Sequence, residues 1–174
     1  KTGKKVWDQY YANRDAVNLA ISGDRTEHVL WRLENGNIDA ISPKLAALMI
    51  GTNNHMSSPP EVTARDIRLI VKQLRTKLPQ TKVLVLAIFP RGGGDDDGAR
   101  QINMRVNDLI ADIGDDEMVH YLNINEVFLN GRRLRQSLIP DGTHPNEKGY
   151  AAWAEAMEPT LAKLLGEEPV IPAD

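Results

Sequence analysis

Short apolar segments alternate with amphipathic segments along the chain, and this alternation constrains the fold more than any other feature. Unbroken apolar runs are typical of parallel strands that are covered on both faces. We predict such strands at residues 16–22, 44–51, 82–90 and 118–124. In the remaining segments apolar residues recur at helical spacing. We predict helices at residues 4–12, 24–36, 59–78, 99–113 and 147–165. This order predicts an α/β protein, a three-layer α/β/α sandwich around a parallel sheet.

The length of 174 residues suits one domain, which we place at residues 1–165, with residues 166–174 as a tail or the beginning of a linker. The first predicted element is the helix at 4–12, not a strand. A doubly wound sheet normally begins with a strand near its middle, and neighbouring strand edges would be left unpaired without it. We therefore predict that the domain is incomplete at its N-terminus and that its first strand precedes Lys1.

Composition excludes several classes of function. The formal net charge of −3 gives no reason to expect a nucleic acid or an anionic membrane surface as partner. No apolar run approaches the roughly 18 residues of a membrane span. Cysteine is absent, which excludes disulfides, thiolate metal sites and a cysteine nucleophile. These observations assign neither a cellular compartment nor an oligomeric state.

Polar residues follow the predicted strands, and ligands of an open α/β sheet bind beyond the carboxyl ends of its strands. In "DGTHPNEKGY" (141–150), Asp141 stands three residues before His144. An imidazole is the usual general base near neutral pH, and a carboxylate at this spacing can reach its Nδ1–H and fix the tautomer. From the spacing alone, however, a surface turn is the simpler explanation.

Two other strand ends supply hydrogen-bond donors. Asn53, in "GTNN" (51–54), carries a side-chain amide of the kind that stabilises an oxyanion. Gly23, in "SGDR" (22–25), lies at a predicted strand-to-helix junction, where backbone N–H groups point outward. Taken alone, each motif is also explained by an ordinary turn.

Four stretches, taken together, resemble a known family. They are "NLAISGDRTEHVLWRLENG" (18–36), "IGTNNH" (50–55), "VLVLAIFPRG" (83–92) and "DGTHPNEKGY" (141–150). In this order they are similar to the SGNH (GDSL-type) hydrolases, in particular to the subgroup like the catalytic subunits of platelet-activating-factor acetylhydrolase. The resemblance runs over most of residues 4–165. It implies a flavodoxin-like fold and the hydrolysis of esters, often acetyl esters, with no metal or cofactor.

The resemblance also implies roles for individual residues. His144 would be the base and Asp141 the acid of a Ser–His–Asp triad. The backbone N–H of Gly23 and the amide of Asn53 would form the oxyanion hole. The residues that would contact the substrate are Thr52, Thr143, Asn54 and His55, of which the two threonines would line a small acyl pocket.

The chain departs from the family at the nucleophile. The family's serine lies in a G-D-S stretch after the first strand, and no such stretch occurs in these 174 residues. The serines present are Ser22, Ser42, Ser57, Ser58 and Ser137. We predict that the nucleophile lies upstream of Lys1 together with the first strand, and Ser22 is the fallback.

The function that we expect is a serine esterase or acylhydrolase that removes small acyl groups, acetyl above all. Acetylated carbohydrates, lipid esters and acyl thioesters remain open as substrates. One alternative is an inactive SGNH-like module that binds carbohydrate or a protein. Another is a metal-dependent hydrolase that uses Asp141, His144 and the aspartates of "GGGDDDG" (92–98), although their spacing matches no EF-hand calcium loop.

Overall fold

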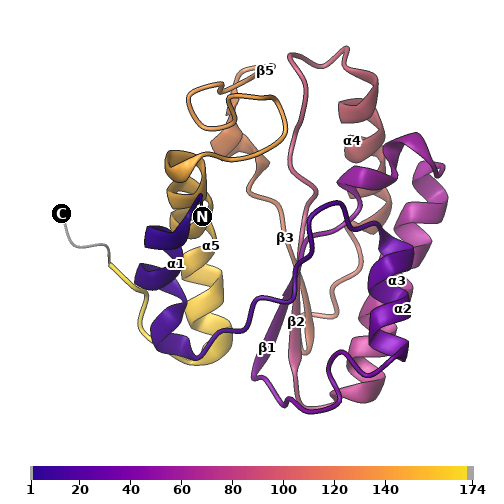
Figure 1. The fold of residues 1–174 in the computed structure, drawn as a ribbon, viewed down its shortest axis with the longest axis vertical. Helices are drawn as coiled ribbons and strands as arrows, with labels where there is room; N and C mark the ends of the chain where they lie inside the picture. The colour runs from indigo at the N-terminus through magenta and orange to yellow at the C-terminus, as the bar shows by residue number, and fades with distance from the viewer. Residues whose placement is uncertain (1, 172–174) are drawn as a thin grey trace.

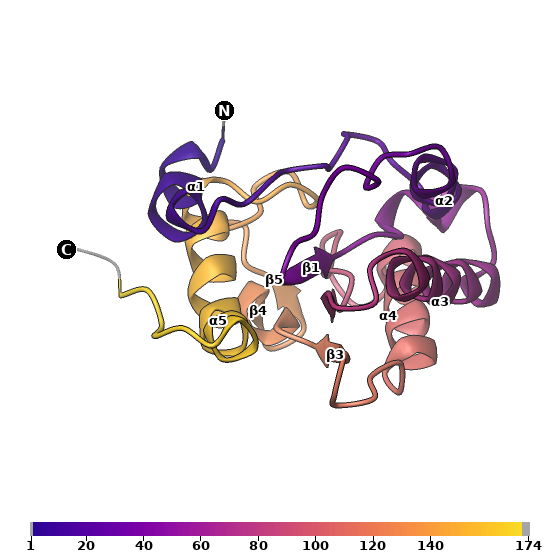
Figure 2. The same cartoon turned by 90° about the horizontal axis from the view of Figure 1, so that it is seen from below.

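The computed structural model describes residues 2–171 and has the predicted three layers (Figure 1). One face of the sheet is covered by α1 (Lys4–Tyr10) and α5 (Glu147–Leu165). The other face is covered by α2 (Thr26–Glu34), α3 (Pro60–Lys77) and α4 (Gly98–Ile110). The view from below separates the two helical layers on either side of the strands (Figure 2). The five helices lie within two or three residues of the predicted bounds, and the fold class is confirmed.

The strands form one parallel sheet and one small antiparallel pair. The parallel strands are β1 (Leu45–Leu48), β2 (Lys82–Leu86) and β3 (Val119–Leu122), adjacent in that order. Parallel neighbours need a crossover, and here α3 and α4 supply it. The antiparallel pair is β4 (Leu129–Asn130) with β5 (Arg133–Leu134).

The central strand β2 explains why both faces of the sheet are covered. Val83 and Val85 pack into a core cluster shared with α3 and α4, whereas Leu84 and Leu86 pack into a second cluster with α5. Successive side chains of a strand point to opposite faces, so an unbroken apolar run needs a cover on each side. The prediction for residues 82–90 is therefore confirmed over Lys82–Leu86, and the rest of that run is buried without being a strand.

The predicted strand at 16–22 is wrong. This segment has no regular structure, and Val17, Leu19 and Ile21 are exposed. An apolar, partly β-branched run becomes a strand only beside a partner edge. Among residues 2–171, β1 pairs with β2 alone, and nothing pairs with 16–22.

The two ends of the described chain meet beside α5. Arg14, in the short 3₁₀ helix η1 (Ala12–Arg14), donates to both carboxylate oxygens of buried Glu158 on α5, at 2.8 and 2.6 Å. The same arginine donates to Glu167 at 2.9 Å, and the backbone N–H of Val170 donates to Glu158. The first part of the predicted tail, 166–171, is thus docked on the domain, and 172–174 lie outside the described residues.

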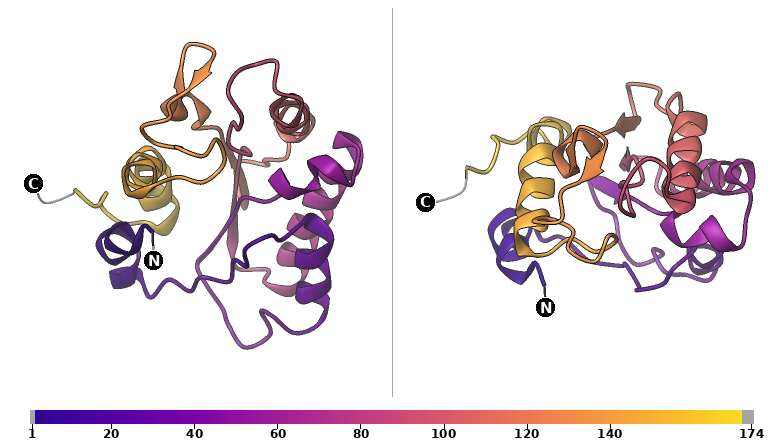
Figure 3. Two further views of the ribbon diagram at one scale, coloured as in Figure 1. Left: turned by 45° about the horizontal axis from the view of Figure 1, so that its top comes forward. Right: turned by 90° about the horizontal axis from the view of Figure 1, so that it is seen from above.

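The loops that follow the strands lie at the same end of the molecule. The segment between β2 and α4 and the segment between β3 and α5 lie close together at the upper end of Figure 1, and two further views agree (Figure 3). A backbone hydrogen bond from Gly92 to Gly142 joins these segments. No helix among the described residues is long and apolar enough to cross a bilayer.

Candidate active site

Asp141 and His144 form a hydrogen-bonded pair in the turn before α5. The Nδ1 atom of His144 lies 2.7 Å from one carboxylate oxygen of Asp141. The other oxygen accepts from the backbone N–H groups of Thr143 and His144, at 2.9 and 2.7 Å. Asn146 then caps α5 by accepting from the Gly149 N–H, as expected of an N-cap. The carboxylate therefore stabilises the turn and also orients the imidazole. The surface turn that the spacing suggested and the paired acid and imidazole are thus present together.

These hydrogen bonds determine the charge of Asp141. The backbone N–H of His144, its imidazole and the Thr143 N–H together hold the pKa of the Asp141 carboxyl well below its usual range. A hydrogen bond to the charged form favours ionisation. Asp141 is therefore a carboxylate at any pH near neutrality, which is the form that orients a base and stabilises an imidazolium.

We expect the Asp141 side-chain carboxyl carbon, followed by NMR, to titrate well below the ordinary aspartate value of about 3.9. The folded pKa is depressed, so the stability that this carboxylate contributes is fully present above the ordinary aspartate value. It is lost as the pH falls through the folded pKa. His144→Ala removes the imidazole but leaves the two backbone donors, so it should raise the pKa only part of the way. A wild-type midpoint at the ordinary value would contradict the assignment.

Asn53 lies in the 3₁₀ helix η2 (Thr52–Met56), which follows β1. Its Nδ2 donates to the backbone carbonyl of Asp24 at 2.9 Å and so ties η2 to the loop that contains Gly23. An amide nitrogen carries two hydrogens, and the second remains for another acceptor. Gly23 has a φ of +83°, and a Cβ built on it would meet nothing within 4 Å. The two proposed oxyanion donors therefore lie in directly bonded loops with open space beside Gly23.

Asn54, expected to contact the substrate, has a different role. It is 1% exposed, and its Oδ1 accepts from the backbone N–H of Thr26 at 3.1 Å. Its Nδ2 donates to the Thr26 hydroxyl and to Glu27. All of these partners are at the start of α2, where free N–H groups need acceptors. This side chain is thus turned inward to the start of α2, and substrate contact by Asn54 stays a prediction.

Gly51 is required by packing. A Cβ at this position would lie 2.7 Å from Ile88 Cδ1 and 3.0 Å from Thr63 Cγ2, and its φ of +121° excludes most side chains. Only glycine therefore fits at position 51, where the backbone lies against the core immediately before η2.

Arg91 connects the remaining predicted residues and was not predicted as a site residue. Its guanidinium donates to the Thr52 carbonyl at 3.1 Å and to the Thr143 hydroxyl at 3.4 Å. His55 lies beside them, with Nδ1 at 2.8 Å from the Thr52 carbonyl. Thr52 precedes Asn53, the predicted oxyanion donor, and Thr143 precedes His144, the predicted base. The signal in the sequence was the position of Arg91, just after the most apolar predicted strand, in "PRGG" (90–93).

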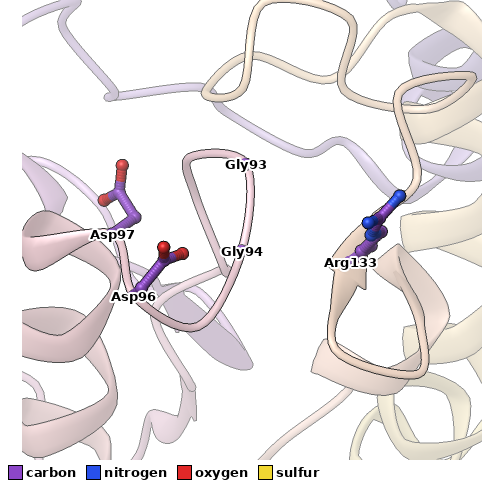
Figure 4. A pocket seen from close by; sticks show the side chains of 5 residues that line it. All are labelled: Gly93, Gly94, Asp96, Asp97 and Arg133. Atoms are coloured by element: carbon purple, nitrogen blue, oxygen red, sulfur yellow. The ribbon is translucent and has the colours of Figure 1, made fainter.

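Two hollows lie beside this pair of loops. The smaller, about 270 Å³, is lined mainly by Gly92, Gly93, Gln136 and Asp141, with Leu134, Pro140 and Gly142 completing it. The larger, about 480 Å³, has Asp96 and Asp97 on one wall and Arg133 on the other (Figure 4). Gly93 lines both hollows, so the larger hollow adjoins the smaller one, which Asp141 lines.

Two of the three aspartates in the loop at residues 92–98 have structural contacts. Asp97 caps α4 by accepting from the Arg100 N–H at 2.9 Å, and Asp95 pairs with Arg100 and Arg132 at 3.2 and 3.3 Å. Within residues 2–171 there is no group of three or more His, Cys, Asp or Glu side chains that could hold a metal ion. The described part of the chain therefore gives no support to a calcium site or a metal-dependent hydrolase.

No serine hydroxyl within residues 2–171 forms a hydrogen bond with His144. Ser22 is exposed next to Gly23, and Ser57 donates to the Asn54 carbonyl. The described candidate site thus presents a histidine hydrogen-bonded to a carboxylate, beside two loops that carry hydrogen-bond donors.

Comparisons with known proteins identify the family of the chain. The GDSL-like lipase/acylhydrolase family matches residues 3–152. Platelet-activating factor acetylhydrolase IB subunit alpha1 from Pongo abelii is 34% identical over 166 residues, which cover 94% of this chain and 71% of that protein. Subunit alpha2 from Rattus norvegicus is 34% identical over 167 residues, covering 95% of this chain and 72% of that protein.

Solved structures show the same fold at lower identity. A GDSL-like lipase from Bacteroides thetaiotaomicron has a TM-score of 0.76 at 17% identity, covering 91% of this chain and 81% of that one. A catalytic mutant of an acetylxylan esterase from Geobacillus stearothermophilus has a TM-score of 0.69 at 19% identity, covering 90% and 74%. The chain therefore belongs to the GDSL-like lipase/acylhydrolase family and is an ester-cleaving hydrolase.

Proposed function

We propose that the protein removes small acyl groups, acetyl above all, from alcohol esters by a Ser–His–Asp mechanism. The observation that carries this proposal is the Asp141–His144 pair at 2.7 Å, joined through Thr143 and Arg91 to the loop that contains Asn53. A base with its orienting carboxylate, beside a hydrogen-bond donor for an oxyanion, is the arrangement that acyl transfer requires.

The reaction proceeds in two similar halves. The Nε2 atom of His144 takes the proton from a serine hydroxyl as its oxygen attacks the ester carbonyl, and Asp141 stabilises the imidazolium. The Gly23 N–H and the Asn53 amide hold the oxyanion of the tetrahedral intermediate. Its collapse breaks the ester bond, and His144 returns the proton to the departing alcohol. Water then repeats these steps on the acyl-enzyme and releases the carboxylic acid.

The nucleophile in this proposal is a serine upstream of Lys1, on a strand that adds to the outer edge of β1. In the described residues β1 pairs only with β2, and the exposed segment 16–22 has no partner. A strand between them would pair both edges and would bring its carboxyl end to the edge where His144 lies.

Two features support a small acyl group on a hydrophilic alcohol. In this proposal the acyl group lies beside Thr52 and Thr143, whose hydroxyls both accept hydrogen bonds from Arg91. The adjoining hollows are lined largely by glycine and by polar side chains such as Asp96, Gln136 and Arg133. Hydroxyl-rich alcohols bind well to such a lining, whereas lipid chains need apolar walls. An acetylated carbohydrate is therefore the substrate class that we favour. Three of the four proteins compared above are named as acetylhydrolases or as an acetylxylan esterase.

The test uses the protein extended upstream of Lys1 and, separately, residues 1–174. We expect only the extended protein to hydrolyse p-nitrophenyl acetate and to react with a fluorophosphonate, with the label located by mass spectrometry on a serine before Lys1. Activity should fall from acetyl to octanoyl esters, and an acetylated xylo-oligosaccharide should be preferred to an acetylated phospholipid. A label on Ser22 would overturn the assigned nucleophile. No hydrolysis of any ester by the extended protein would instead indicate a binding module.

A further inference from the structure

Arg91 stands at the junction of two loops that are distant in sequence. It follows the buried segment after β2 and is itself half-buried. One terminal nitrogen donates to the carbonyl and the hydroxyl of Thr52, at 3.1 and 3.3 Å. The other donates to the hydroxyl of Thr143 at 3.4 Å. A guanidinium is a rigid planar fork, so these contacts fix the spacing of the two loops through one group.

Each contact is one residue away from a group that the proposed reaction uses. Thr52 precedes Asn53, and Thr143 precedes His144. Thr52 is also held from the other side, because Asn103 on α4 donates to its hydroxyl at 3.2 Å. A shift of Thr52 would therefore also move the Asn53 amide, and a shift of Thr143 would also move the His144 ring.

Among residues 2–171, no carboxylate forms an ion pair with Arg91. Within the described residues Arg14, Arg32 and Arg100 form ion pairs with Glu158, Asp24 and Asp95. Arg91 forms none there, and its partners are uncharged oxygens and the His55 ring at 3.4 Å. A partly desolvated positive charge beside an oxyanion hole stabilises negative charge that develops in the transition state.

We propose that Arg91 is a positioning residue that sets the distance between the oxyanion loop at Thr52–Asn53 and the base loop at Thr143–His144, and adds a positive field there. This inference rests on the proposed function, because it assigns Arg91 to the geometry of the same reaction. Neither the oxyanion donor nor the base touches Arg91 in the hydrogen bonds described, so its effect is transmitted through the two threonines.

The fold offers a reason why the substitution Arg91→Met should leave the protein folded. The backbone hydrogen bond from the Gly92 N–H to the Gly142 carbonyl, at 2.9 Å, joins the two segments without the arginine side chain. Methionine keeps the length of the apolar stem and removes the charge and the fork.

A matched control exists at the other end of the sheet. Arg75 on α3 is also half-buried and also donates to uncharged oxygens, the carbonyls of Leu78, Pro79 and Thr81. Arg75→Met removes the same chemical group from the same kind of environment, but near the start of β2. A merely structural role of Arg91 predicts that the two variants behave alike.

The experiment measures kcat and KM with p-nitrophenyl acetate for the upstream-extended protein, with active sites counted by fluorophosphonate titration. We expect Arg91→Met to lower kcat per titrated site by about 10–100-fold with little change in KM, because a loop displacement of about 1 Å can cost that much. Arg91→Lys keeps the charge but not the fork and should recover only part of the loss. Arg75→Met should lower the melting temperature and keep kcat.

An unchanged kcat per site in Arg91→Met would overturn this inference while leaving the esterase proposal intact. An inactive wild type would overturn the esterase proposal, and a second readout then decides the role of Arg91. Amide NMR shifts of both Thr52 and Thr143 should move in Arg91→Met and stay in place in Arg75→Met. A shift at only one of the two threonines would show that Arg91 does not link the loops.

Discussion

We expect His144→Ala to lower kcat for p-nitrophenyl acetate by about 10⁴–10⁶-fold, because the loss of a triad base removes proton transfer in both halves of the reaction. No other histidine in the described residues is hydrogen-bonded to a carboxylate at the end of the sheet where Asn53 lies. The His144 side chain is 76% exposed, so its truncation should have little effect on folding. The measurement is kcat per mole of folded protein, with the folded fraction taken from the melting curve.

Two further variants make this result specific. Asp141→Asn removes the charge that orients the ring and should lower kcat by about 10⁴-fold. His120→Asn, on β3 and paired in register with Leu84, should change stability and keep kcat. A His144→Ala protein that kept more than a tenth of wild-type kcat would show that another group acts as base.

The second large effect is expected for Asn53→Ala, which should lower kcat by about 10²–10³-fold with a small change in KM. An oxyanion donor acts mainly on the transition state, so its removal appears in kcat. The variant also loses one hydrogen bond to the Asp24 carbonyl, which lies at 2.9 Å. Such a bond typically contributes about 1 kcal/mol, too little to unfold a domain of this size.

The neighbouring Asn54 is the matched control. Asn54→Ala leaves the Thr26 N–H without its acceptor and should lower the free energy of unfolding by about 1–3 kcal/mol. It should keep kcat per folded molecule, because the Asn54 side chain is only 1% exposed. Urea unfolding and active-site titration separate the two effects. A wild-type kcat in Asn53→Ala would remove this residue from the oxyanion hole.

The periodicity of apolar residues was sufficient to predict the helices and the central strand β2. The stripe of Ile67, Ile70 and Leu74 predicted α3 and the face that it buries, and all three side chains are buried. The run around Val83–Leu86 predicted a strand covered on both sides, and it is one. Such patterns report burial directly, because a helix or strand repeats its core-facing positions at a fixed interval.

The same reasoning failed where regular structure depends on a partner. The segment at 16–22 has a strand-like composition, yet Val17 and Ile21 are exposed and no strand among the described residues pairs with it. Hydrogen bonds of a strand are made with another segment, so composition alone cannot supply them.

The sequence by itself determined the local part of the site. The Asp141–His144 pair joins residues three apart within one turn. The four stretches of family resemblance predicted an ester-cleaving hydrolase of the family that matches the chain. Only the tertiary structure showed that Asn53 and Asn54, which are neighbours with the same side chain, have different hydrogen-bond partners. Only it revealed that Arg91 contacts both loops. The physical reason is range: hydrogen bonds within a turn follow from the local chain, whereas burial and loop-to-loop contacts depend on segments far away in sequence.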